Sequence, residues 1–181
     1  MSEHYLIFAA QVNQQSFTTM INYITGLHAN GATKLTVAIS SMGGHISSGV
    51  GICNALKSLS FEVNTHNFGS VDSIANVIFS AGKKRFVNAS STFMFHGAGF
   101  ESNPQERLEE KNLKEKLDTI KAEHQRMSKI LSSSSTLTER QWLNLFRNQN
   151  TKNADWAIKC GFATGQQEFL IPTNANVMYL T

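Results

Sequence analysis

The sequence predicts an α/β fold with a largely parallel sheet, and three observations support this class. Short apolar or alternating segments, which are typical of strands, are separated by longer segments of helical period. Glycine-bearing turns at Gly43-Gly44 and at Gly69 each follow a strand-like segment and come just before a helical one. The 181 residues, 41% of them hydrophobic and 16% charged, fit one domain that buries its own core. We therefore expect βαβ crossovers within a single domain spanning residues 1–181.

The first half of the chain is predicted to contain five strands and three helices. The strands are expected at residues 5–12, 35–39, 61–68, 85–87 and 92–96. The helices are expected from a cap at Ser16 to Asn30-Gly31, from Ser47 or Ser48 to Leu59, and over residues 73–81. Residues 69–72 are predicted to form a tight turn between the third strand and the third helix.

The second half is predicted to be mainly helical. A long helix is expected from Pro104 to about Leu131, with Ser102 or Asn103 as its cap. A narrow apolar seam runs along it at Leu113, Leu117, Ile120, His124, Met127 and Leu131. This stripe fits either a helix that packs on another helix or an ordinary amphipathic surface helix. Two shorter helices are expected, one from the cap Thr138 to Phe146 and one over 154–159, and strands at 168–171 and 177–180.

Composition and charge argue against several classes. The formal net charge is +3 and the basic residues are scattered apart from 83–85, so nucleic acid is not expected as the main partner. Cys53 and Cys160 form no Cys-x-x-Cys pair and the histidines share no ligand spacing, so we expect free thiols and no metal. The N-terminus lacks the basic start and long apolar run of a secretory signal, and no stretch is apolar enough to span a membrane. We expect a soluble, cytoplasmic protein.

Ser73 and His96 are the candidates for chemistry. Ser73 comes after a turn and begins a helix, where a nucleophilic hydroxyl has free backbone N–H groups nearby. Taken alone, however, Ser73 or Asp72 is better explained as the cap of that helix. Gly43-Gly44 can aim N–H groups at a developing oxyanion or can form an ordinary turn. His96 ends a strand, where a lone histidine is more often structural.

Four segments, taken in order, favour the catalytic interpretation of Ser73 and His96, because together they resemble the Clp protease proteolytic subunit (ClpP) family. The segments are AISSMGGHISSG at 38–49, GSVDSIAN at 69–76, SAGKKRF at 80–86 and FMFH at 93–96. They are similar to the family's Asn-Ser-Pro-Gly-Gly, Gly-x-Ala-Ala-Ser-Met-Gly, Ala-Ala-Gly…Lys-Arg-Phe and Val-Met-Ile-His segments. The interval from Gly44 to Ser73 matches the family's without a gap, and that from Ser73 to His96 is two residues shorter.

The resemblance implies a ClpP/crotonase-like fold of repeated ββα units with a protruding handle helix at about 104–131. It also implies a serine endopeptidase that acts on peptides or unfolded proteins without metal or organic cofactor. Ser73 falls on the family's nucleophile and His96 on its general base, while Gly44 and Ile74 supply the oxyanion-hole N–H groups. The handle implies a homo-oligomer of rings, which are stacked in the family.

Three departures from the family's pattern are visible. Met42 stands where the family has a proline before Gly-Gly, which bears on the rigidity of that loop. The family's axial loop and first helix precede its first strand, predicted here at Tyr5, so an AAA+ unfoldase partner is not assumed. Counting back from Asn153 puts the family's catalytic aspartate at Gln149, where no carboxylate is present. An amide can orient an imidazole but cannot stabilise its charge, and aspartate-to-asparagine replacement in a serine triad costs about 10⁴ in kcat.

Three other functions are kept as alternatives. A ClpP-like structural or regulatory assembly subunit with little activity would account for the missing aspartate. An acyl-CoA enzyme of the crotonase type shares the related fold, although Ser73 and His96 together argue against it. A Ser-Lys dyad would need Lys83 or Lys84, which are poorly placed in the resemblance.

Overall fold

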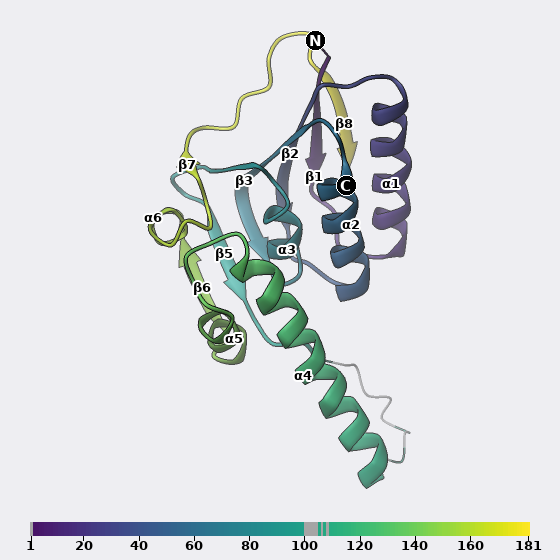
Figure 1. Cartoon of the computed structure of the whole chain (residues 1–181), viewed down its shortest axis with the longest axis vertical. Helices are drawn as coiled ribbons and strands as arrows, with labels where there is room; N and C mark the ends of the chain where they lie inside the picture. The colour runs from purple at the N-terminus through teal and green to yellow at the C-terminus, as the bar shows by residue number, and fades with distance from the viewer. Residues whose placement is uncertain (1, 100–104, 106, 108) are drawn as a thin grey trace.

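The computed structural model describes residues 2–99, 105, 107 and 109–181, and within them eight strands form one sheet (Figure 1). The strands are β1 (Glu3–Phe8), β2 (Lys34–Ser41), β3 (Glu62–Asp72), β4 (Lys84–Val87), β5 (Thr92–Phe95), β6 (Asn150–Asn153), β7 (Gly165–Gln166) and β8 (Asn176–Leu180). The helices are α1 (Gln14–Ala29), α2 (Ile46–Ser58), α3 (Ala75–Phe79), α4 (Glu110–Ser132), α5 (Glu139–Arg147) and α6 (Ala154–Lys159).

The sheet is largely parallel, as predicted, with the main order β6-β5-β3-β2-β1-β8. Among the described strands every pairing is parallel except that of β5 with β6. Parallel neighbours need crossovers, and α1 and α2 supply them between β1, β2 and β3. These two helices and α3 lie side by side on one face of the sheet (Figure 1). The main core fills the space between this face and the helices, with Leu6, Phe8, Leu35, Ile39 and Ile52 fully buried.

The third strand is longer than predicted, and the predicted turn at residues 69–72 is wrong. β3 continues through Asp72, pairing first with β4 and then, from Ser70 onward, with β5. Gly69 lies within the strand, where Ser40 of β2 comes too close for a side chain, because a Cβ there would be 2.7 Å from Ser40 Oγ. A shift of register between Ile39 and Ser41 accompanies this change of partner.

Other boundaries also differ from the predictions. α1 is capped by Asn13, with Ser16 as the reciprocal partner of a capping box, so the predicted cap at Ser16 is wrong. The predicted strand at 168–171 is wrong as well, since the strand nearest to it is β7 at Gly165–Gln166. β6 was not predicted because its sequence, Asn-Thr-Lys-Asn, carries no apolar alternation. The cap Thr138 and the helix over 154–159 are confirmed.

The long helix protrudes from the body of the molecule (Figure 1). Its described part begins at Glu110, and the expected start at Pro104 lies outside the described residues. The inner half of the seam is buried at His124, Met127 and Leu131, whereas Leu113 and Leu117 are 48% and 49% exposed. The apolar stripe therefore continues beyond the part that the body of this chain covers.

The same core continues to the place where α5 and α6 meet β5. It consists of aromatic rings packed edge to face, namely Phe79, Phe93, Phe95, Trp142, Phe146 and Phe162. Through this cluster the helices fix the end of β5 at which His96 lies. Over the described residues, no helix combines the length and the apolar character required to cross a bilayer.

Candidate active site

Ser73 forms a strained elbow between β3 and α3. Its φ is +56°, a left-handed conformation that is uncommon and costly for a residue other than glycine. Two neighbours hold it there: Ser73 N–H donates to Met94 O at 2.8 Å, and Asn76 Nδ2 donates to Ser73 O at 2.9 Å. Backbone strain of this kind persists only where surrounding contacts impose it, and it gathers at functional sites.

The side chain of Ser73 does not cap α3. The cap position is Ile74, which makes no side-chain capping bond, and the Asp72 carboxylate accepts instead from Ser70 Oγ at 2.5 Å. The capping interpretation of Ser73 and Asp72 is therefore wrong. The helix begins at Ala75, two residues later than expected, because the elbow occupies the positions before it.

The Gly43-Gly44 loop lies directly against the elbow. The φ values of Gly43 and Gly44 are +84° and +142°, which only glycine adopts without strain. A Cβ on Gly43 would come 2.7 Å from Ser73 Cβ, and one on Gly44 would come 2.2 Å from Val12 O. No side chain fits at either position, so the loop presents bare backbone beside the hydroxyl of Ser73.

The loop is held by hydrogen bonds in place of the family's proline. Val12 N–H donates to Gly43 O at 2.8 Å, and Ser41 Oγ accepts from Gly43 N–H at 3.2 Å while donating to Ala10 O at 2.6 Å. Met42 is 77% exposed and takes no part in these contacts. A proline at position 42 is therefore not needed to fix the loop.

Backbone N–H groups near the elbow have no acceptor among the described residues, and those of Gly44, Ile74 and Ala75 are among them. The bridge between Val12 and Gly44 uses the neighbouring groups Gly43 O and His45 N, which leaves Gly44 N–H directed away from Val12. The Ile74 side chain is fully buried beneath Gly49 of α2, whereas its N–H is one of the unbonded donors at the start of α3.

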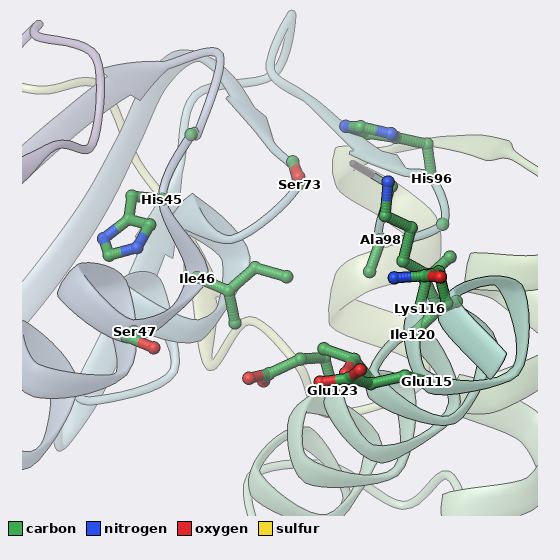
Figure 2. A pocket seen from close by; sticks show the side chains of 15 residues that line it. His45, Ile46, Ser47, Ser73, His96, Ala98, Glu115, Lys116, Ile120 and Glu123 are labelled. Carbon is green, nitrogen blue, oxygen red and sulfur yellow. The ribbon is translucent and has the colours of Figure 1, made fainter. Parts of the chain in front are cut away.

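His96 and Ser73 line the same cavity, which has a volume of about 770 Å³ and is also lined by Gly44 (Figure 2). The two strands that carry them are neighbours in parallel, with Asp72 opposite Met94, and therefore end at the same edge of the sheet. Figure 2 shows the imidazole of His96 extending toward the side of the cavity on which Ser73 lies. Over the described contacts, the Ser73 hydroxyl and the imidazole are not joined by a direct hydrogen bond.

Gln149 lies beside His96 in the register of the sheet. β6 pairs antiparallel with β5, with Asn150 opposite Phe95, so the same register continued by one residue sets Gln149 opposite His96. Gln149 is exposed, has a φ of +49°, and is not among the described residues that line the cavity. The pairing itself ends at Phe95 and Asn150, and the Gln149 side chain is not bonded to His96 in the described structure.

The sequence did not identify α4 as a wall of the cavity. One face of this helix lines it, with a helical spacing that could have been recognised: Asn112, Glu115, Lys116, Thr119, Ile120 and Glu123. Spacing alone cannot tell which face of an amphipathic helix turns toward a cleft, and of the apolar seam only Ile120 is among the described residues that line the cavity.

His124 joins this helix to the loop that follows His96. Its Nε2 accepts the N–H of Ala98 at 2.7 Å, and its ring stacks on Phe146 with centroids 6.2 Å apart. An Nε2 that accepts a hydrogen bond carries no proton, so this contact requires the neutral imidazole. Burial lowers the pKa of His124 and favours the same neutral form.

Comparisons with known proteins agree with this geometry. The family model described as Clp protease matches residues 1–165. The chain is 30% identical over 94 residues to the ATP-dependent Clp protease proteolytic subunit of Cyanophora paradoxa, a match that spans 50% of this chain and 48% of that relative. The alignment thus reaches across about half of the relative's length.

The fold is that of a known structure. A variant of ClpP1 from Listeria monocytogenes superposes with a TM-score of 0.81 at 17% identity, covering 92% of each chain. The predicted ClpP/crotonase-like fold with a protruding helix is confirmed by this match. With a family model that matches from residue 1 to residue 165, this chain belongs to the Clp protease family.

Proposed function

We propose that this protein is a serine endopeptidase in which Ser73 is the nucleophile and His96 its general base. The observation that carries the proposal is the strained elbow, which presents the Ser73 hydroxyl at a cavity shared with His96. Two backbone N–H groups without acceptors, from Gly44 and Ile74, lie at the same elbow. These are the parts that acyl transfer to a serine requires.

In the proposed reaction the Ser73 oxygen attacks the peptide carbonyl while His96 takes the hydroxyl proton. The oxyanion of the tetrahedral intermediate accepts hydrogen bonds from Gly44 N–H and Ile74 N–H, and loss of one such donor typically costs about 10²–10³ in kcat. His96 then gives its proton to the leaving amine, which leaves an acyl ester on Ser73. Water, deprotonated by His96, hydrolyses that ester and restores the free enzyme.

We assign the orienting group of His96 to Gln149, which would lie opposite it if the register of β5 and β6 were continued by one residue. The side-chain oxygen of Gln149 would accept the second N–H of the imidazole and so fix its tautomer. An amide supplies no negative charge to stabilise the imidazolium, so turnover is expected to be slow. Replacing Gln149 by Asp should raise kcat, whereas replacing it by Ala should lower it.

The assembly is part of the same proposal. We infer a homo-oligomer of rings in which α4 packs against its counterpart, because Leu113 and Leu117 extend the apolar seam onto an exposed surface. The substrates are peptides or unfolded proteins. Delivery of substrate by an AAA+ unfoldase is a further proposal, prompted by the words "ATP-dependent" in the name of the Cyanophora paradoxa relative.

The test is hydrolysis of casein and of a panel of fluorogenic peptides by the purified protein. We expect slow cleavage by the wild type and its loss in Ser73→Ala and His96→Ala. Ser47→Ala is the matched control, because this serine lines the same cavity without a part in the mechanism. Cleavage that persists in Ser73→Ala would refute the assignment. Rings that form but cut none of these substrates would favour the assembly subunit instead.

A further inference from the structure

The cavity beside Ser73 contains a carboxylate that lacks a full set of partners, that of Glu123 on α4. Its side chain is only 23% exposed, and its Oε2 is buried without a hydrogen-bond partner in the described structure. Its other oxygen lies 3.5 Å from Arg126 Nη1, a guanidinium whose own side chain is 44% exposed. Buried carboxylate oxygens are normally satisfied, and the side chain of Glu123 lines the cleft, so a ligand with a donor that turns Oε2 toward the cavity would complete its set of partners.

Glu123 lies at the inner end of the cavity. The next residue, His124, binds Ala98 N–H at 2.7 Å, which ties this turn of α4 to the loop directly after His96. Glu115 and Lys116 line the cavity from farther out, about 12 Å and about 10 Å away along the helix axis at 1.5 Å per residue. Figure 2 shows the carboxylates of Glu115 and Glu123 reaching into the cavity, below Ser73 in that view.

Apolar groups line the space between the carboxylate and the elbow. Ile46 at the start of α2 and Ile120, one turn before Glu123, both face the cavity. The cavity as a whole, at about 770 Å³, is large enough for a long side chain. An arginine or lysine of the substrate has an aliphatic stem that suits these walls and a cationic end that suits the carboxylate.

We propose that Glu123 makes this cleft select a basic residue, arginine or lysine, on the carbonyl side of the scissile bond. The inference rests on the proposed peptidase function and adds its substrate class. A guanidinium would share the carboxylate with Arg126 and supply the donor that Oε2 lacks, within a partly desolvated site. An apolar side chain in the same place would cover the carboxylate and leave its Oε2 without a donor, which binding sites reject.

The test compares peptide substrates that differ only at this position, with arginine, lysine, leucine or citrulline, the neutral isostere of arginine. We expect kcat/KM of the wild type to favour arginine over citrulline on the order of 100-fold. Glu123→Gln should remove most of that ratio while keeping cleavage of the leucine and citrulline peptides. Asp118→Asn, on the same helix but outside the cavity, should leave the ratio unchanged.

The outcomes separate the two proposals. If the wild type cleaves the leucine peptide as well as the arginine peptide, or if Glu123→Gln keeps the wild-type ratio, the basic preference is overturned and the peptidase function stands. If none of the four peptides is cleaved and Ser73 does not react with an active-site probe, both proposals fail. Urea unfolding of Glu123→Gln, expected to match the wild type, shows that a change in ratio does not come from loss of structure.

Discussion

Asn76 offers a direct test of how the Ser73 elbow is held. Its side chain is fully buried, and Nδ2 donates to Ser73 O and to Met94 O, both at 2.9 Å. Its Oδ1 has no partner in the part of the chain that the structure describes. Replacing Asn76 by Asp keeps the shape but turns a double donor into an acceptor that faces two carbonyl oxygens.

The size of the effect follows from the state of the new carboxyl group. Ionised, it would be an uncompensated buried charge, which costs about 3–5 kcal/mol. Protonated, it keeps one donor and loses one hydrogen bond, or about 1 kcal/mol. Its folded-state pKa is therefore raised above its unfolded value, and the extra loss of stability appears as the pH rises above about 4. Between pH 5 and 7 the difference from the wild type should grow by up to about 2.7 kcal/mol.

Urea unfolding of the wild type and Asn76→Asp at pH 5 and pH 7 measures this directly. Asn148→Asp is the control, because that residue is exposed and should show almost no change. A loss below about 1 kcal/mol at pH 7, or one that is independent of pH, would show that the amide does not brace the elbow as described.

Three further predictions concern packing, protonation and thiol access. Trp142→Ala should lower the free energy of unfolding by about 3–5 kcal/mol, because the indole is fully buried in the aromatic cluster; a loss below about 1 kcal/mol in urea melts would contradict this. Burial lowers the folded-state pKa of His124. The stability that its neutral form provides is therefore fully present above pH 6.5 and is lost as the pH falls below that value. His124→Gln should flatten the fall of Tm between pH 7 and 5, and an unchanged slope would argue against the contact with Ala98. Burial raises the pKa of the thiols of Cys53 and Cys160, so both should react with a thiol reagent rapidly only in urea; immediate reaction of native protein would refute their burial.

The pattern of strand-like and helical segments predicted the parallel sheet, whereas the meeting of Ser73, His96 and Gly44 at one cavity was implied by the resemblance to the ClpP family. Of the two glycine-bearing turns expected at strand ends, Gly43-Gly44 follows β2 and lies beside Ser73, whereas Gly69 lies inside β3. The sequence did not predict that β3 runs to Asp72, because a glycine after an apolar segment is more typical of a turn than of a strand interior. The left-handed Ser73 was also missed, because tertiary contacts from Met94 and Asn76 impose that conformation.

The walls of the cavity were the least predictable part of the site. Glu123 lines the cavity because α4 packs on the loop after His96, and this contact joins residues far apart in the sequence. β6 has a polar sequence, and it pairs with β5, a strand far from it in the sequence. Such features depend on long-range packing, for which local periodicity contains no signal.

The nucleophile can be identified chemically by treating the native protein with a fluorophosphonate and following its intact mass. The account predicts a single adduct that peptide mapping locates on Ser73, with much slower labelling in His96→Ala and none in Ser73→Ala. An adduct on another residue, or equal labelling of Ser73→Ala, would contradict the claim that this elbow carries the reactive hydroxyl.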